Sequence, residues 1–501
     1  SNALDGINVI ADGQRGAVMV LGSYLNGTVP TPITALGNGQ DGIRALVSSA
    51  QEGAQLIGSD LNASGNGANG LEANVIGREE VNLILGLASD GGTNILLRPV
   101  QANDNDGAGL LLSAVSTTGS VNFAPLAFIA NSNGAAGLQA LVSAYSNVLF
   151  AVGGLGGTLL PFPVDGSGEA IGNGTNGLDL NIASTAGSVS GSVANVTANR
   201  NAGDGANILL SAADSITAAL SDSTFNQNDE AGFRLQYAAG TSEYVAVENV
   251  VANGNGAGNR AQSLDGSDGS SALFIRNVTV STNGSSVGLI AHALSDGSAT
   301  VVVENVVANN NFQGVDLYAR GSAGAAFMSM SNVVANNNTT IGVEGDALAD
   351  GGNAQIRVRD VTANNNGTYG VELLSVNSGA SESRVIVSGD LTVNNNQTGA
   401  LFAARSDGTA VVLFNLNNNV SASNNANHGI VGAAEGDFGS VSLNAGFVPA
   451  VNNNGNYGLV ALAVGTNGTF ANALNPSGTG NGSGNSFTDT ANVGPWQALL
   501  P

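Results

Sequence analysis

The sequence predicts an all-β fold, a single-stranded right-handed parallel β-helix of about 15–16 coils with about 28 residues in each coil. Three observations support this fold class. An Asn-x-Asn marker returns at nearly constant spacing, a glycine usually follows it four residues later, and runs of alternating apolar and polar residues fill the rest of each repeat. A fixed period of roughly 20–50 residues is the signature of a solenoid, whose stacked repeats share one core.

The marker is in most coils the second Asn of an Asn-x-Asn motif, and its positions define the coils. From Asn173 onward its spacing is nearly constant, whereas the earlier steps that end at Asn105 and Asn173 are longer and predict insertions in those coils. Asp12, which lies nearly one coil before Asn38, is a candidate marker for a sixteenth coil. The fifteen markers are Asn38, Asn66, Asn105, Asn133, Asn173, Asn201, Asn228, Asn255, Asn283, Asn311, Asn338, Asn366, Asn396, Asn425 and Asn454.

Each coil is expected to contain three short strands and three corners. The glycine that follows the marker, as at Gly342 and Gly370, is predicted to take a positive φ and so to turn the chain tightly. The alternating residues after it predict strands with one face inward and one face outward. Bends at Asn305, Asp360 and Asp390 are expected to lead into the third strand.

Stacking of coils is expected to complete the fold, because so short a unit cannot bury its own apolar face. Successive coils would pair in parallel about 4.8 Å apart, and the connection rule for parallel strands makes the winding right-handed. The marker residues would then line up in asparagine ladders, in which each side-chain amide donates and accepts hydrogen bonds between coils.

The repeat also carries a family resemblance. The pattern Asn-Val-x-x-Asn-Asn-x-x-x-Gly-Val, as at residues 305–315, resembles the repeats of the pectate-lyase-like superfamily and of the β-helical passenger domains of bacterial autotransporters and adhesins. The resemblance covers about residues 35–460, and it implies the fold, since the repeat residues build the scaffold and not a site.

Pectate lyases of this fold use basic residues and carboxylate-bound calcium, and polygalacturonases use Gly-His-Gly and Asp-Asp motifs. This chain has no lysine and carries Asn427-His428-Gly429 instead, which disfavours both activities.

Composition narrows the classes of function. The chain has 37 acidic residues against 13 basic ones, all of them arginine, and a formal net charge of −24. Such an acidic protein repels phosphate backbones and anionic lipids, so we expect no nucleic-acid partner. The absence of cysteine excludes disulfides and thiolate metal sites. No apolar run approaches the roughly 20 residues of a membrane helix, so no membrane span is expected. The chain is interpreted as a fragment of a larger exported protein or as a trimmed mature form.

The chain divides into three predicted parts. Residues 1–34 form an N-terminal lead-in and cap with a candidate first coil, residues 35–460 form the β-helix, and residues 461–501 form the last coil and a C-terminal cap. The two insertions are expected around residues 78–80 and within residues 147–163, as binding loops or as neutral surface excursions. Trp496, the only tryptophan, is predicted to plug the C-terminal end of the core.

Two kinds of motif suggest a bound ligand. Gly-x-Gly-x-x-Gly occurs at three repeat corners, where it indicates turns and not dinucleotide binding, because no crossover helix follows. Oxygen-rich stretches are candidate calcium sites, against the simpler interpretation that they are polar turns. The candidate metal ligands there are Asp104, Asp106, Asp265 and Asp268, and no other cofactor is expected.

The sharpest candidate site lies on one outward strand face. Stacking predicts a column of Asp316, Glu344 and Glu372 about 5 Å apart, where like charges repel, raise a pKa or bind a cation. These three are the catalytic candidates, because carboxyls about 5–5.5 Å apart suit a retaining glycosidase. A solvated acidic face and a cation or glycan groove are the alternatives. The full predicted ligand-binding set is His292, Asp316, Tyr318, Arg320, Glu344, Asp346, Glu372 and Arg234.

The expected function is that of an exported scaffold or adhesin-like rod, extracellular or on a bacterial cell surface. It would bind a polysaccharide or a cell-surface protein without catalysing a reaction. The alternative is a polysaccharide lyase or glycoside hydrolase acting on the outward strand face. An enzyme is expected to show long corner loops flanking a cleft over the column, whereas a scaffold is expected to show a bare face.

Overall fold

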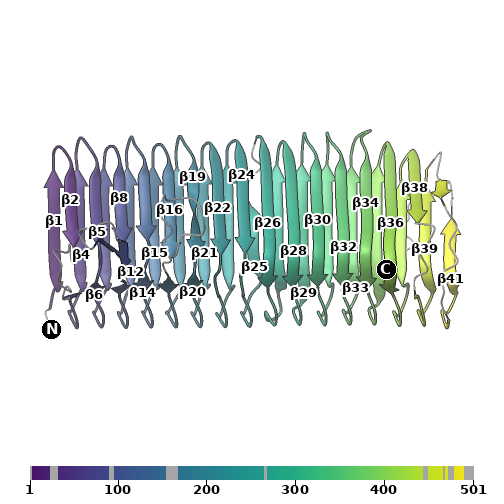
Figure 1. Cartoon of the computed structure of the whole chain (residues 1–501), viewed down its shortest axis with the longest axis horizontal. Coiled ribbons are helices and arrows are strands. Elements are labelled where there is room, and N and C mark those ends of the chain that lie inside the picture. The colour runs from purple at the N-terminus through teal and green to yellow at the C-terminus, as the bar shows by residue number, and fades with distance from the viewer. Residues whose placement is uncertain are drawn as a thin grey trace. The chain divides into compact units, whose positions relative to one another are not determined.

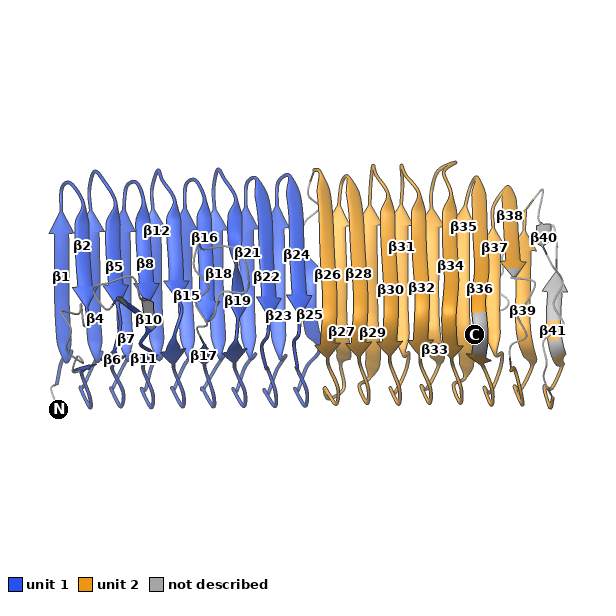
Figure 2. Cartoon of the chain, in the orientation of Figure 1, with its two compact units in different colours: residues 1–265 blue, residues 266–501 orange. Residues whose placement is uncertain are grey.

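The chain forms two compact parallel β-solenoid units, residues 1–265 and residues 266–501, each of which is described by itself (Figure 2). The computed structural model describes residues 3–22, 32–89, 95–153, 167–264, 268–443, 450–465, 469–471 and 479–489. Strands account for all the regular structure in these ranges, and in each unit they stack coil on coil (Figure 1). The predicted parallel β-helix fold is therefore confirmed, while its right-handed sense stays a prediction.

Unit 1 has two main sheets and a row of short strands, all paired in parallel. Sheet A of unit 1 contains β1 (Ile7–Gly13), β4 (Ile43–Ser49), β7 (Leu71–Gly77), β12 (Leu110–Ser116), β15 (Leu138–Ala144), β18 (Leu178–Ser184), β21 (Ala206–Ala212), β23 (Phe233–Ala239) and β25 (Asn259–Ser263). Sheet B of unit 1 contains β2 (Ala17–Leu21), β5 (Ala54–Gly58), β8 (Val81–Leu85), β13 (Val121–Pro125), β16 (Val148–Gly153), β19 (Val189–Ala194), β22 (Ser215–Ser221) and β24 (Ser242–Glu248). The short strands are β3 (Ile33–Thr34), β6 (Leu61–Asn62), β11 (Val100–Gln101), β14 (Phe128–Ile129), β17 (Gly168–Glu169) and β20 (Val196–Thr197).

Unit 2 has the same two sheets. Its sheet A contains β27 (Val287–Ser295), β29 (Gln313–Gly321), β31 (Val343–Ala349), β33 (Tyr369–Asn377), β35 (Thr398–Ser406), β37 (Ile430–Glu435), β39 (Tyr457–Val464) and β41 (Gly484–Asp489). Its sheet B contains β26 (Ser270–Thr279), β28 (Ser298–Val307), β30 (Ala326–Val334), β32 (Ala354–Thr362), β34 (Ser383–Thr392), β36 (Thr409–Ser421), β38 (Phe438–Leu443) and β40 (Thr469–Ala471).

The bend before the third strand segment lies where the sequence predicts it. Asn305 and Asp360 have φ of 56° and 54°, in the left-handed region that Asn and Asp tolerate best after glycine. In unit 2 the second and third segments run on as one long strand across this bend. In β34 the left-handed residue is Gly389, with φ of 72°, and not the expected Asp390.

The asparagine ladder is present in both units. The backbone N–H and the side-chain amide of Asn38 both donate to Oδ1 of Asn66, at 3.0 and 2.9 Å. In unit 2 the same pair of bonds joins Asn338 to Asn366, each at 3.0 Å. These side chains are buried, so each coil satisfies the polar groups of the next.

Both ends of the marker series differ from the expectation. Asn454 donates to Oδ1 of Asn481, at 2.9 and 3.0 Å, so the ladder continues to a position that was not among the predicted markers. The first coil exists, because β1 pairs with β4, but Asp12 is not its marker. Asp12 lies inside β1 opposite Ser48, whose hydroxyl donates to it at 2.6 Å. A carboxylate has no N–H to donate and so cannot replace a ladder amide.

The glycine after the marker has a different role from the one predicted. Gly342 and Gly370 do not lie in the left-handed region, which instead falls on the residue before each marker, such as Asn337 with φ of 59°. A Cβ added at Gly342 would lie 2.5 Å from the carbonyl oxygen of Gly370 and 2.8 Å from Nδ2 of Asn366. The glycine is therefore required because the next coil's ladder approaches too closely for a side chain.

The core lies between the two sheets of each unit. Along β29, Val315, Leu317 and Ala319 are buried, and they face residues such as Met328 and Met330 of β30. The residues between them point outward and are partly exposed. This alternation fixes which side chains of sheet A form its outer face.

The first insertion is not where it was expected. Residues 78–80 form a regular turn, in which Arg78 N–H donates to the Glu52 carbonyl at 3.0 Å. The extra residues form an antiparallel hairpin further on, β9 (Leu87–Ser89) with β10 (Ile95–Leu97). Leu87 and Leu97 pack against the outer face of sheet B around Leu126. The inserted hairpin therefore covers part of the outer face of sheet B with apolar side chains. The spacing of the markers did not reveal this.

The second insertion and the predicted plug lie largely outside the described residues. Residues 148–153 are the regular strand β16, paired with β13 and β19, so the expected span of 147–163 began too early. Residues 154–166, which hold the rest of that span, are not described. Trp496 also lies outside the described residues, so its predicted role stays a prediction.

The ladder should dominate local stability. In Asn338→Leu, the Asn311 N–H loses its acceptor at 2.9 Å and the Ala308 carbonyl loses its donor at 3.1 Å. Since each buried polar group left unpaired costs about 1–3 kcal/mol, we expect the free energy of unfolding to fall by about 3 kcal/mol or more. Chemical denaturation followed by circular dichroism measures this. The exposed neighbour Thr339→Ala is the control, and an equal effect of both changes would contradict the ladder's role.

A glycine four residues after a marker, such as Gly342, and a glycine directly before a marker, such as Gly65, should respond differently to substitution. Gly342→Ala is expected to lower the free energy of unfolding by about 2–3 kcal/mol, because the new Cβ overlaps the next coil. Gly65→Asn is expected to change it by less than about 1 kcal/mol, because Asn tolerates a φ of 68° and nothing lies within 4 Å of the added Cβ. Thermal denaturation of both variants tests the ranking, and the reverse order would contradict this assignment.

Candidate functional site

The predicted carboxylate column is present on the outer face of sheet A in unit 2. In the strand register, Asp316 of β29 lies opposite Glu344 of β31, and Glu344 lies opposite Glu372 of β33. The three side chains share one outward row because their neighbours in sequence, Val315 and Val343 among them, point into the core. The register therefore brings together the three residues nominated from the sequence.

A second outward row lies beside the column, with His292, Tyr318 and Asp346 in register. His292 Nε2 lies 3.2 Å from Oδ2 of Asp316 and so joins the two rows. The rings of His292 and Tyr318 are tilted, with centroids 5.5 Å apart. We call the two rows together the acidic strip: His292, Asp316, Tyr318, Glu344, Asp346 and Glu372.

The two nominated arginines have acidic partners of their own. Arg320 lies one row beyond Tyr318, and its guanidinium is 3.8 Å from Oδ2 of Asp350 in the following turn. Arg234 belongs to unit 1, where its guanidinium lies 3.2 Å from Asp204 and 3.0 Å from Glu230. Burial raises the pKa of the Asp204 carboxyl, although the Ala231 N–H and Arg234 oppose this. The three carboxylates that pair with these arginines all lie outside the column.

Burial and mutual repulsion perturb the acidic strip. Burial, followed by the charges of Glu344 and Asp346, raises the pKa of Glu372 to about 7. The same causes, with Glu344 and Asp316 as the neighbours, raise the pKa of Asp346 to about 6. The pKa of Glu344 is also raised by burial and by Asp316, while the Gln313 amide, which donates to it at 2.7 Å, acts in the opposite direction. Glu372 is therefore partly protonated near neutral pH, and Asp346 takes up its proton at slightly lower pH.

The calcium candidates do not form a cluster in the described residues. Asp104 and Asp106 are both exposed and lie on either side of the buried Asn105. Asp268 is exposed in the turn before β26, and Asp265 lies outside the described residues. Across the described ranges, no group of three or more His, Asp or Glu side chains is arranged to hold a metal ion. Calcium binding stays a prediction.

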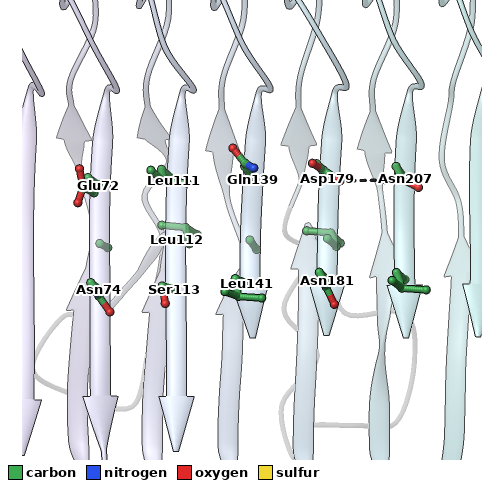
Figure 3. Close-up of a pocket in the computed structure, with 14 residues that line it drawn as sticks. Glu72, Asn74, Leu111, Leu112, Ser113, Gln139, Leu141, Asp179, Asn181 and Asn207 are labelled. Atoms are coloured by element: carbon green, nitrogen blue, oxygen red, sulfur yellow. Dashed lines mark hydrogen bonds between the residues drawn. The ribbon is translucent and has the colours of Figure 1, made fainter. Parts of the chain in front are cut away.

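Sequence reasoning missed a groove on the outer face of sheet A in unit 1 (Figure 3). It has a volume of about 520 Å³ and crosses β7, β12, β15, β18 and β21. Its outward side chains form two parallel rows, as Figure 3 shows. The first row holds Glu72, Leu111, Gln139, Asp179 and Asn207, and the second holds Asn74, Ser113, Leu141, Asn181 and Leu209.

The groove combines a largely apolar lining with polar side chains, most of which are uncharged. The Asn207 amide donates to Oδ1 of Asp179 at 3.0 Å, which fixes one side of the first row. At the other end, burial raises the pKa of Glu72, with a hydrogen bond to Asp41 as the next cause, although Arg44 lies 3.6 Å away. The signal in the sequence was the run of Asn, Gln and Ser at outward positions where other coils carry charges.

The Asn427-His428-Gly429 motif is structural. The His428 ring is parallel to that of Tyr457 with centroids 6.1 Å apart, and His428 Nδ1 accepts from the Tyr457 N–H at 3.4 Å. Burial lowers the pKa of this histidine, so it is neutral at physiological pH. These contacts bind one corner of the solenoid to the next.

Comparison with known proteins found no match to this chain. No protein-family model, no curated protein and no solved structure matches the chain. The site must therefore be interpreted from its own geometry. The described residues also contain no helix long and apolar enough to cross a membrane.

The acidic strip should make stability depend on pH. The pKa of Glu372 is higher in the folded chain than its ordinary value of 4.5, so the folded chain holds this proton more tightly than the unfolded chain does. The resulting contribution to the free energy of unfolding is complete below about pH 4.5 and is lost as the pH rises through about 7. Glu372→Gln removes this loss. After allowance for solvent screening, we expect the variant to be more stable than the parent by about 1–2 kcal/mol at pH 8 and equal to it at pH 4.

Urea denaturation across this pH range measures the difference. Glu79→Gln, in an exposed turn of unit 1, is the matched control and should show no such pH-dependent gain. A difference between parent and Glu372→Gln that stays constant from pH 4 to pH 8 would contradict the assigned pKa.

Proposed function

We propose that this protein is a non-catalytic scaffold, exported to the cell surface or beyond, that binds a neutral glycan along the outer face of sheet A in unit 1. The observation that carries the proposal is the groove of Figure 3, in which amide, hydroxyl and carboxylate groups and leucine side chains share two rows across successive strands. Strand spacing of about 4.8 Å presents these groups at regular intervals to an extended chain.

The chemistry of the groove favours a neutral sugar chain. Side-chain amides both donate and accept hydrogen bonds, so Gln139, Asn181 and Asn74 can each pair with sugar hydroxyls in either sense. Leu111 and Leu141 lie between them and offer apolar surface to the sugar's C–H groups. A net charge of −24 opposes the approach of an anionic polysaccharide.

The proposed scaffold role rests on the difference between the outer face of the sheet, which can vary, and the core, which repeats. Each coil adds one outward position to every row of the same sheet face, while the ladder and the core repeat unchanged. We also propose that the solenoid is right-handed and related to the pectate-lyase-like superfamily or to autotransporter passengers, on the strength of the repeat pattern and the connection rule.

Polysaccharide cleavage at the acidic strip is the second candidate. It is favoured by Glu372 and Asp346, whose raised pKa values suit a general acid near neutral pH. It is opposed by the corners over these coils. The turns at residues 322–325, 350–353 and 378–382 are short, whereas an enzyme is expected to have long corner loops there.

Binding measurements on the full chain test the proposal. We expect a panel of neutral polysaccharides to contain a ligand whose affinity falls at least tenfold, about 1.4 kcal/mol, in the double variant Gln139→Ala, Asn181→Ala. Gln236→Ala is the matched control, because Gln236 is an outward amide of the same sheet beyond the groove. Isothermal titration calorimetry gives the affinities.

Two outcomes would overturn the proposal. The first is the absence of binding to every neutral polysaccharide, or an equal loss in Gln236→Ala. The second is release of reducing or unsaturated ends from a polysaccharide, abolished by Glu344→Gln, which would establish the enzymatic alternative in its place.

A further inference from the structure

The first coil of unit 1 has an open edge. Among the described strands, β1 pairs with β4 and β2 pairs with β5, each along one side (Figure 1). An unpaired edge presents a row of backbone N–H and C=O groups that can pair with another chain. This edge is separate from the proposed glycan groove, which begins at β7.

The backbone groups on the open edge of β1 can be identified. Ile7 donates its N–H to the second coil, to the Gly42 carbonyl at 3.0 Å. Alternate residues of a strand in a parallel ladder bond to opposite sides. The residues whose N–H and C=O groups point away from β4 are therefore Asn8, Ile10 and Asp12.

The edge residues also expose large apolar side chains. In β2, the Ala17 N–H donates to the Gly53 carbonyl at 3.2 Å, so Val18 and Val20 bond toward the open edge. Val18 is 63% and Val20 43% exposed, and Ile10 of β1 is 64% exposed. Apolar side chains gathered at one end of a molecule indicate a contact surface.

The core is partly open at the same end. Ile7 and Val9 of β1 point inward, yet both are partly exposed. Their register partners in β4, Ile43 and Ala45, are almost completely buried. Another coil stacked on β1 would remove this apolar surface from water, which is favourable.

The pattern along β1 is complementary to itself in the antiparallel sense. With Ile10 of one copy opposite Ile10 of a second copy, Asn8 of each lies opposite Asp12 of the other. Every residue that bonds toward the edge then meets another such residue, and each pair exchanges backbone hydrogen bonds. The side chains also match, since Ile packs on Ile and an Asn amide donates to an Asp carboxylate.

The charges at the ends of β1 agree with this register. Asp5 lies five residues before Ile10 and Arg15 lies five residues after it. The antiparallel pairing therefore brings Asp5 of each copy to the end of the edge where the other copy has Arg15. Residues 3–22 carry three charged side chains, two acidic and one basic, so this end avoids most of the chain's net charge of −24.

One two-fold axis can serve both strands. A Cβ added at Gly13 would lie 3.7 Å from the Ala17 Cβ, so the end of β1 faces the start of β2. The middle of β1 at Ile10 therefore lies across the core from the part of β2 around Met19 and Val20. An axis through both places would also pair β2 with its copy and bring their exposed valines together.

We propose that two copies of this chain associate end to end about a two-fold axis, with β1 and β2 of each copy pairing antiparallel with the same strands of the other. This contact uses the same surface on both copies, so it closes as a dimer and does not propagate. It also removes the open edge from both copies.

The mass of the full chain in solution is the first test. Size-exclusion chromatography with light scattering is expected to give twice the mass of one chain at micromolar concentration. Ile10→Lys would place two like charges opposite each other, and we expect it to raise the dissociation constant at least a hundredfold by analytical ultracentrifugation. A monomeric parent chain would overturn the proposal.

Ile76→Lys is the matched control. Ile76 is an outward, 37% exposed residue of the same sheet, on β7 two coils from the edge, and its substitution should leave the dissociation constant unchanged. Equal weakening by both changes would contradict the proposed interface. Circular dichroism confirms that each variant has folded.

A single cysteine tests the register without weakening the contact. The chain has no cysteine, so Ile10→Cys can form a disulfide only with its own copy. Facing residues of a hydrogen-bonded antiparallel pair lie about 5.5 Å apart at Cα, which a disulfide can bridge. We expect Ile10→Cys, and not Ile76→Cys, to give a covalent dimer under oxidised glutathione. A dimer in which Ile10→Cys fails to cross-link would overturn the proposal.

Exchange of the end charges provides the last test. Asp5→Arg and Arg15→Asp are each expected to raise the dissociation constant several-fold, and the double variant Asp5→Arg, Arg15→Asp should return it toward the parent value. Asp5 also accepts from the Asn8 amide at 3.2 Å, so loss of that bond alone would not be reversed by a change at Arg15. Absence of recovery in the double variant would contradict this register.

Discussion

The structure depends on the hydrogen bonds between asparagines of successive coils. Along the ladder the side-chain oxygen of a marker accepts from the preceding coil, as Asn338 does from Asn311 and Asn366 does twice from Asn338, so the polar groups of the buried corner are satisfied. The glycine four residues later is part of the same constraint, because it leaves room for the ladder amide of the next coil. Once these corners repeat, strand register and the outward rows follow from the alternation of side chains.

This dependence explains which features could be predicted from the sequence. Marker spacing places Asp316, Glu344 and Glu372 in one row, because a coil of nearly constant length returns the chain to the same position. It does not reveal the reason for the glycine, since a position that forbids a Cβ and a position with positive φ select the same residue. The position of an extra segment inside a coil is also hidden, as residues 78–80 and the β9–β10 hairpin show.

The outer face of sheet A is less constrained than the core, and this is why its chemistry varies along the chain. In unit 1 the outward rows hold amides and leucines, in unit 2 they first hold carboxylates, and from β35 to β39 they become apolar. Sequence reasoning found the carboxylates because charge is conspicuous. It missed the groove and these apolar rows because Asn, Ser, Ala and Leu are common throughout this chain, and only the structure shows which of them point outward.

Hydrogen exchange at the ladder tests the central claim most directly. NMR of the marker residues Asn311, Asn338 and Asn366 can follow both the backbone N–H and the side-chain Nδ2 protons. If coil-to-coil ladders hold the corners, both kinds of proton exchange many times more slowly than in an unfolded peptide, and the backbone N–H is protected as well as those of the strands. Side-chain amides that exchange at the rate of free asparagine would contradict the account.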